Sequence, residues 1–565
     1  MLVIFYLPVI LFFLLVPIMN EAVELPRSVA LIIFALLYVI VKPKSLAVKN
    51  KLFYLPFLIP ITYLVSSFFN NQNILSALFG GYKRNFGVLT YLAIAIIFVI
   101  TLNLRLKDSS KFFKISLLPL SILSIIYSFI QLSGSDFLLW GEGDRVVLTI
   151  GNSNFAASYI AILLPSLLYG VATSRGKSFK SLYLALFFLL FYCGIQTKSF
   201  QFNIVAFISI SVFLFVTFYH LFIKINLLVR TTGLVTIVSA LFYVVINYRD
   251  TLNAFTSADD RLSQQRVGLE IFFDNILFGV GVDSLQQYTP LYIRAEDIRR
   301  EGGDIVADKT HNAFVDHLAN GGIFTGISYT LFFLAIFYFI TKLLKTGEKY
   351  NVNLALPSAI FVGYVSQLFI NTDSILNLIV PYISMGLIGG FYLNSQSETS
   401  TSLTAANKLL IIRVAAITSL ILTLPLSMRI IVTDVQVRNI MNNKYMDGDK
   451  IIEILNMWPN PKPTELVMIK YVQDVKNCPF VDRVSSRLLE VDPLSGQAWF
   501  AKSICADAYN DQVSSLNFVK KALKFQPVNT RYLDVQYQLE KYLRYDVDAA
   551  KTLSRINSIL KPPTP

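Results

Sequence analysis

The chain has 565 residues, of which 54% are hydrophobic and only 15% are charged, with a mean hydropathy of +0.57. Soluble domains carry about 25% charged residues, so this composition excludes an ordinary soluble globular protein and indicates a membrane protein. The net charge of +13 could suggest nucleic acid. However, the basic residues gather in alternate short loops, as in loops kept in the cytoplasm, and we expect no nucleic-acid partner.

Apolar runs long enough to cross a lipid bilayer as helices recur along the chain, and we expect about thirteen of them. Their centres are expected near residues 10, 35, 60, 95, 122, 163, 187, 212, 238, 332, 363, 385 and 420. The run over 1–19 lacks a basic start and a small-residue cleavage site, so we interpret it as a retained helix. The basic loops predict a cytoplasmic N-terminus, with the loop 248–318 and everything after Arg429 on the opposite side.

The loop 248–318 is the longest connection between apolar segments, and long loops of this kind are usually functional. Its segment from Arg261 onward predicts a helix lying at the membrane surface, with apolar residues on one face and charged residues on another. The apolar face comprises Leu262, Leu269, Phe272, Phe273 and Ile276, and the charged face comprises Arg266, Glu270 and Asp274. We expect Gly279 and Gly281 to form a turn after this helix.

The C-terminal part, 431–565, is polar and helical in pattern, and we expect it to form a separate extracytoplasmic domain after the membrane domain 1–430. Pro459, Pro493 and Pro527 follow one another at intervals of 34 residues, and each ends a helical run. This period is typical of tetratricopeptide repeats, which bind protein partners on a concave face. The alternative is a helical domain whose prolines coincide by chance.

The cysteines show no metal-ligand spacing. Cys193 lies inside an apolar run, whereas Cys478 and Cys505 lie in the C-terminal domain. These two could pair if that domain faces an oxidising compartment.

Polar and charged residues recur at the predicted outer ends of the membrane spans. They are Lys83, Arg84, Asn152, Asn154, Lys198, Arg266, Arg294, Arg299, Arg300, His311, Asn312 and Asp373. Polar groups are costly at membrane depth, so they tend to line a functional cavity. Several cations beside a histidine suit an anionic substrate, and at an outer leaflet a lipid-linked diphosphate is the obvious one.

Each of these residues also has a purely structural interpretation. Arg84 could anchor the chain at the interface, and Arg266 could pair with an acidic residue one helical turn away. Lys198 could be solvated in a turn, and His311 could simply begin a helix. His317 would lie on a different helical face from His311, and we expect it to be structural.

No metal cluster, catalytic serine arrangement or phosphate-binding loop emerges, so we expect neither a metal nor a cofactor. The remaining chemistry combines a base with cations. A histidine would accept a proton from an acceptor hydroxyl, and arginines would stabilise the charge that grows on a departing diphosphate.

Four segments together resemble the O-antigen ligase and O-antigen polymerase superfamily of bacterial membrane glycosyltransferases. They are GGYKRNFGVLTYL, GNSNFAASYIAILLP, RVGLEIFFDNILFGVGVDS and THNAFVDHLANGGIFTG, all between residues 50 and 395. The resemblance implies an all-α polytopic enzyme in the bacterial inner membrane, embedded in the lipid bilayer. This enzyme would transfer a glycan from undecaprenyl diphosphate at the outer face, during synthesis of cell-surface polysaccharide such as lipopolysaccharide.

The resemblance also implies roles for individual residues. His311 would act as the base or orient the acceptor, supported by Asn312. Arg266 and Arg84 would bind the diphosphate. Lys83, Lys198 and Arg294 are further candidate contacts to it.

One element of the family pattern is missing, since Phe200 stands where the family usually has an arginine. Either Lys198 substitutes as a point charge, or the site binds diphosphate differently, or the site is inactive.

The acceptor stays open between lipid A core, another lipid-linked repeat unit and a protein side chain. These acceptors correspond to a ligase, a polymerase and a protein oligosaccharyltransferase. A transporter or a non-catalytic scaffold is the rival from another class, although no internal symmetry of the kind found in transporters is seen.

Overall fold

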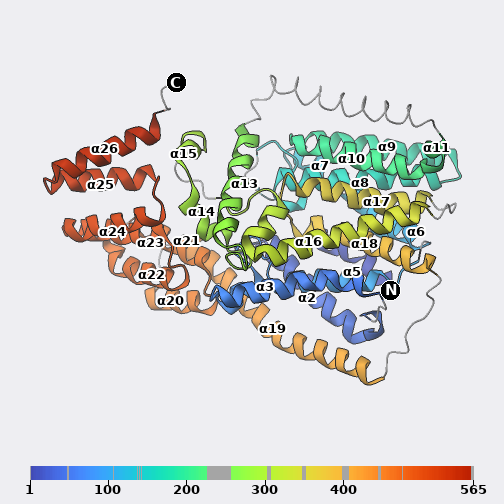
Figure 1. Cartoon of the computed structure of the whole chain (residues 1–565), viewed down its shortest axis with the longest axis horizontal. Helices are drawn as coiled ribbons and strands as arrows, with labels where there is room; N and C mark the ends of the chain where they lie inside the picture. Colours follow the sequence, from blue (N-terminus) through green and yellow to red (C-terminus); the bar gives the residue numbers. More distant parts are fainter. Residues whose placement is uncertain are drawn as a thin grey trace.

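The computed structural model consists of helices, and the part of the chain that it describes contains no β-strand (Figure 1). The structure describes residues 2–46, 50–105, 107–136, 138, 140, 143–224, 256–301, 307–345, 351–396, 406–442, 447–473 and 475–561. The fold is all-α, as the sequence predicts.

Among the described residues, nine helices are long and apolar enough to cross a membrane. They are Glu24–Val41 (α2), Lys51–Phe69 (which includes α3, Leu55–Phe69), Asp108–Leu132 (α6 to α7), Ser153–Thr173 (α8), Lys177–Ile195 (α9), Phe200–Thr217 (α10), Ala313–Lys345 (α16), Ile375–Ser395 (α18) and Asn407–Asn442 (within α19). Shorter apolar helices occur at Val3–Phe13, Val88–Thr101 (α5) and Val352–Leu368 (within α17, Asn351–Leu368). Together they account for every predicted span except the one near residue 238, which lies outside the described residues. The chain is therefore a polytopic membrane protein.

Helix α18 forms the centre of the bundle, because 94% of the residues in its apolar stretch are buried. In the apolar stretch of α19 only 11% of the residues are buried. Small residues explain the close packing of α18. A side chain at Gly386 would collide with Thr101, and one at Gly390 would collide with the backbone carbonyl of Leu102. Small residues let membrane helices approach closely, while the exposed apolar side chains of α19 suit contact with lipid.

Helix α19 (Ala406–Asn442) contains the last span and extends beyond it toward the C-terminal helices. The predicted boundary at 430/431 therefore falls inside one helix. The helices that follow lie beyond one end of the bundle (Figure 1). They are Gly448–Met457 (α20), Pro461–Tyr471 (α21), Cys478–Val491 (α22), Gly496–Ala508 (α23), Gln512–Phe525 (α24), Thr530–Tyr542 (α25) and Asp546–Leu560 (α26).

The proline period coincides with the starts of three of these helices. Pro459, Pro493 and Pro527 lie in the links before α21, α23 and α25. In each link a side-chain oxygen caps the next helix, from Asn460, Ser495 and Asn529 respectively. The C-terminal domain is thus a series of helix pairs, and its membership of the tetratricopeptide family stays a prediction. A disulfide between Cys478 and Cys505, whose Cα atoms are 5.3 Å apart, joins α22 to α23.

The described part of the loop 248–318 forms α13 (Thr256–Asp274), α14 (Leu285–Tyr292) and α15 (Ala295–Glu301). These helices lie between the bundle and the C-terminal domain (Figure 1). The predicted helix is present as α13, and Gly279 and Gly281 turn the chain with φ of +62° and +102°.

Helix α13 packs on the bundle through apolar residues outside the predicted apolar face. Its buried residues include Val267 and Ile271, which pack against Ala319 of α16. The predicted apolar face is exposed at Leu262, Leu269, Phe273 and Ile276, and only Phe272 of that set is buried.

Candidate active site at one end of the bundle

His311 lies in the link that leads into α16, and local hydrogen bonds fix its backbone. Its φ of +52° is unusual for a residue with a side chain, and such conformations persist only where the surroundings enforce them. The side-chain oxygen of Asn312 accepts hydrogen bonds from the amides of Phe314 (3.0 Å) and Val315 (3.3 Å). The Thr310 amide donates to the carboxylate of Asp316 at 2.8 Å. Asn312 therefore positions His311 by capping α16.

The hydrogen bond of the His311 ring decides which ring nitrogen carries the proton. Nδ1 lies 3.1 Å from Oδ1 of Asn371. That oxygen also accepts from the Thr372 amide at 2.9 Å, and the Asn371 amide nitrogen donates to Gln201 at 3.3 Å. Because Oδ1 of Asn371 is an acceptor, Nδ1 of His311 must be the donor. The lone pair is then on Nε2, which has no hydrogen-bond partner among the described residues.

Two arginines from different parts of the chain act on His311. Arg84, in the loop before α5, donates to both carboxylate oxygens of Asp308, at 2.7 Å and 3.1 Å. Its guanidinium also lies over the ring of Phe155, 5.5 Å from the centroid. Arg261 of α13 donates to the carbonyl of Ile370 at 3.3 Å, next to the asparagine that holds the imidazole.

These surroundings keep the imidazole neutral. Burial, followed by the charges of Arg261 and Arg84, lowers the pKa of His311 to about 4. Burial of Asp308 acts to raise its pKa, but the guanidinium of Arg84 outweighs burial and holds that pKa well below its usual range. At neutral pH the site therefore combines an uncharged imidazole, two guanidinium cations and one carboxylate. That protonation state is the one required of a general base.

Gly268 allows α13 to approach the link that carries His311. A side chain at this position would collide with the methyl group of Thr310 and contact Val315 at 2.9 Å. Arg261 lies two turns earlier on the same helix, so this close approach also brings its guanidinium to the site.

Arg266 and Arg294 belong to a neighbouring network of ion pairs. Arg266 bonds to Glu270 at 2.9 Å and to Asp297 at 2.6 Å, while Arg294 bonds to Glu270 at 2.5 Å. The Asp297 carboxylate is nearly buried. This network joins α13 to α15, so both arginines organise the elements beside the His311 group.

The two predicted lysines lie at the surface. Lys83 is exposed beside Arg84, with a φ of +72°. Lys198 is exposed and forms an ion pair with Asp144. The residues that follow Lys198 point inward: Ser199 donates to Asn154 at 2.7 Å, and Gln201 accepts from Asn371. Phe200 itself begins α10.

His317 lies in a separate and buried group. Its Nδ1 is 2.7 Å from the hydroxyl of Tyr63, and the rings of Tyr91 and Tyr329 pack against it. Nearby, Lys309 and Asp283 form an ion pair of 2.6 Å with little exposure. These contacts give His317 a structural role.

Sequence reasoning missed three residues of the site: Arg261, Asp308 and Asn371. Asp308 stands three residues before His311, and Asn371 stands two residues before Asp373. Their neighbourhoods were therefore identified, but the contacts that single them out join segments more than 40 residues apart in the chain.

The fold and the site define a polytopic membrane protein with an uncharged histidine and two arginines at one end of its bundle. Residues 146–330 match the model of the O-antigen ligase family. This match covers less than half of the chain, and it supports a relationship to the O-antigen ligase superfamily. No curated protein matches the chain. The matched range includes Arg261 and His311, whereas Arg84 and Asn371 lie outside it and are brought to the site by the fold.

Proposed function

We propose that the protein transfers a glycan from an undecaprenyl-diphosphate donor to a hydroxyl acceptor at the extracytoplasmic face of the bacterial inner membrane. The observation that carries this proposal is the state of His311. Its Nδ1 is bound to Asn371, its Nε2 is available, and the charges of Arg261 and Arg84 both act on the ring. The match to the O-antigen ligase family supports the reaction class.

The proposed reaction is a displacement at the anomeric carbon of the donor sugar. The acceptor oxygen forms a bond to that carbon, and its proton passes to Nε2 of His311. The bond between the anomeric carbon and the diphosphate oxygen breaks, and its electron pair leaves with the diphosphate. No other reactant is needed, because the leaving group is already activated.

The arginines near His311 would stabilise the departing diphosphate. Among charged groups, Arg261 and Arg84 have the largest effects on the pKa of the imidazole. Lys83 adds an exposed cation beside Arg84. A guanidinium binds phosphate oxygens in pairs, which fixes their geometry as well as their charge. Arg266 and Arg294 would position α13 and α15, and Lys198 would meet the substrate at the surface.

A reconstituted transfer reaction tests this proposal. The purified protein in proteoliposomes would receive an undecaprenyl-diphosphate oligosaccharide, with or without lipid A core. Longer chains on undecaprenyl would identify a polymerase, and sugar on lipid A core would identify a ligase. His311→Gln should lower the rate at least about 100-fold, because general-base catalysis contributes that much. His220→Gln, which changes an exposed histidine on α11 (Tyr219–Lys224), is the matched control and should leave the rate unchanged.

A second variant separates the positioning of His311 from its chemistry. Asn371→Leu removes the acceptor that fixes the Nδ1 proton, so kcat should fall about tenfold or more while KM for the donor changes little. Equal transfer by wild type and His311→Gln, with clear product in both, would refute the assignment of the base.

A further inference from the structure

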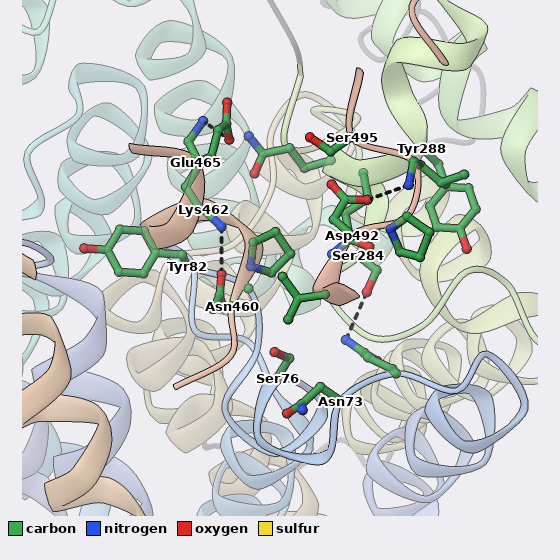
Figure 2. Close-up of a pocket in the computed structure, with 18 of the residues that line it drawn as sticks. Asn73, Ser76, Tyr82, Ser284, Tyr288, Asn460, Lys462, Glu465, Asp492 and Ser495 are labelled. Atoms are coloured by element: carbon green, nitrogen blue, oxygen red, sulfur yellow. Dashed lines mark hydrogen bonds and ion pairs between the residues drawn. The ribbon is translucent and has the colours of Figure 1, made fainter. Parts of the chain in front are cut away.

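A cavity lies between the membrane domain and the C-terminal helices, with a volume of about 570 Å³. We call it the amide cleft, after the side chains that line it. Its floor comes from the segment after α3, one wall from α14, and the opposite wall from the links before α21 and α23. In Figure 2, Asn73 and Ser76 lie at the bottom of the view, Asn460 lies to the left, and Tyr288 and Asp492 lie to the right.

Uncharged hydrogen-bonding groups dominate the lining of the cleft. They include Asn70, Asn71, Gln72, Asn73, Gln286, Gln287, Tyr288, Asn460, Gln497 and Gln526. Amide and tyrosine side chains both donate and accept hydrogen bonds, and aromatic rings add an apolar surface. This combination suits a ligand with many hydroxyl groups.

The charged groups of the cleft are largely matched within the protein. Lys462, the lone cation among the described lining residues, pairs with Glu465 at 2.9 Å. Asp283 pairs with Lys309 at 2.6 Å, and Glu490 pairs with Arg487 at 2.5 Å. Burial raises the pKa of the remaining carboxyl, Asp492, to about 7. The described lining thus holds a single cation among several carboxyl groups, which suits an uncharged ligand better than a diphosphate.

Two buried polar atoms in the lining lack a partner within the described residues. Asn460 is 2% exposed, and its Oδ1 accepts from the Lys462 amide, but its Nδ2 has no hydrogen bond. The side-chain oxygen of Gln497 is buried and likewise unpaired. Such atoms are rare in folded proteins because each costs about 1–3 kcal/mol. Both atoms belong to residues that line the cleft.

The cleft adjoins an apolar groove on one side and the loop of Arg84 on the other. Asn71 and Gln72 line both the cleft and a groove formed by apolar side chains of α3 and α4 (Ile74–Phe79). Gly81 and Tyr82, just before Arg84, line the cleft as well. A ligand in the cleft can therefore reach both an apolar surface and the loop that carries a site arginine.

We propose that the amide cleft binds the uncharged saccharide units of a lipid-linked glycan, while the diphosphate lies near His311. This inference rests on the proposed function, and it assigns to the C-terminal domain a direct part in holding the glycan. The volume of the cleft lies within the range of pockets that enclose small ligands, and it accommodates a short oligosaccharide.

Binding measurements on the full-length protein in nanodiscs test the inference without requiring transfer. The probes are an undecaprenyl-diphosphate oligosaccharide isolated from host membranes and undecaprenyl diphosphate without sugar. The test variant is the double substitution Gln287→Ala with Gln497→Ala, which removes hydrogen-bonding groups from opposite walls. Asn460 is left intact because it caps α21. The control is Gln538→Ala, an exposed glutamine on α25 outside the cleft.

The double variant should bind the lipid-linked oligosaccharide about tenfold more weakly, as expected for two lost hydrogen bonds. Its affinity for the sugar-free carrier should match that of wild type, and the control should match wild type for both probes. Unchanged oligosaccharide affinity in the double variant, or an equal loss for both probes, would overturn the inference.

His311→Gln separates failure of this inference from failure of the proposed function. If the cleft binds glycan but His311 is not the base, oligosaccharide binding will still depend on the two glutamines while transfer survives in His311→Gln. If the base is correct but the cleft is not a glycan site, transfer will be lost in His311→Gln and binding will be unaffected by the glutamines.

Discussion

His311 depends on neighbours that fix its protonation state before any substrate binds. Asn371 fixes the proton on Nδ1, while burial, Arg261 and Arg84 disfavour a second proton. The two arginines thus act twice in the proposed reaction. They keep the base neutral in the free protein, and they stabilise the anion that leaves.

The lowered pKa of His311 predicts an unusual pH dependence of transfer. The neutral imidazole is the active form, so activity should fall as pH decreases through about 4, rather than near the usual value of about 6.5. The groups that face His311 are Arg261, Arg84, Asp308 and Asn371, and the pKa of Asp308 lies lower still. The measurement is kcat/KM against pH, which reports the free enzyme.

A substitution at Asn371 provides the control for this profile. Asn371→Asp places an anion beside the ring, so the acid limb should move upward by about one pH unit or more. An acid limb near pH 6.5 in wild type, unmoved by Asn371→Asp, would contradict the arrangement of the site.

The sequence indicated the His311 segment because polar groups at the edge of apolar spans need a physical reason. It could not rank the arginines. Arg266 and Arg261 lie on the same helix, and only the fold shows that Arg266 is bound by two carboxylates while Arg261 lies near the imidazole. Asp308 and Asn371 likewise have no distinguishing pattern, because their roles come from contacts between distant segments.

Helix α13 is the element that brings the long loop to the site. It packs on α16 through Val267 and Ile271, and the missing side chain of Gly268 lets it approach Thr310. Apolar periodicity predicted this helix and one apolar row along it, but it did not identify the second row, with Val267 and Ile271, that packs on α16. In a membrane protein both rows have an apolar surrounding available, so hydrophobicity alone does not choose between them.

Gly268→Ala should displace α13 without disturbing the membrane bundle. The added methyl group overlaps Thr310, and overpacking of this kind costs about 1–3 kcal/mol. We expect the transfer rate to fall about tenfold or more, because a small shift of Arg261 and His311 disrupts the geometry. The measurements are transfer rate and helical content by circular dichroism.

Gly176→Ala is the control for this element. An added methyl group there meets only the ring of Phe179, at 3.4 Å, so activity should be retained. A fully active Gly268→Ala would show that the distance between α13 and the His311 link does not matter.

At the scale of the whole molecule, the disulfide gives a test of orientation. Cys478 and Cys505 are joined, and Cys193 is buried in the bundle. Disulfides persist in oxidising compartments, so an extracytoplasmic C-terminal domain should keep this one in cells. A maleimide–polyethylene glycol reagent applied to denatured protein should label one thiol without reductant and three after reduction. Labelling of all three without reductant would place the domain in the cytoplasm.

The long loop and the C-terminal domain form one unit through α15. Ile298 is 7% exposed and belongs to the apolar core of the C-terminal domain, where α15 contacts α26. Arg299 donates to the carbonyl of Ile559 at 2.8 Å. Because α13, α14 and α15 are consecutive, the C-terminal domain holds the same loop that supplies Arg261 and one wall of the amide cleft. Separate prediction of two domains from composition could not show this connection.

Ile298→Asp should release the loop from the C-terminal domain. A carboxylate in that apolar core is strongly unfavourable unless it is paired, so α15 should detach rather than bury the charge. We expect faster proteolysis within 285–301, weaker binding of lipid-linked oligosaccharide and slower transfer, while the membrane bundle stays folded. Val547→Asp, at a position of α26 that is 70% exposed, is the control and should change none of these. Normal transfer with a cleaved or released loop would show that the C-terminal domain does not support the site, whereas joint loss of loop protection and transfer would show that it does.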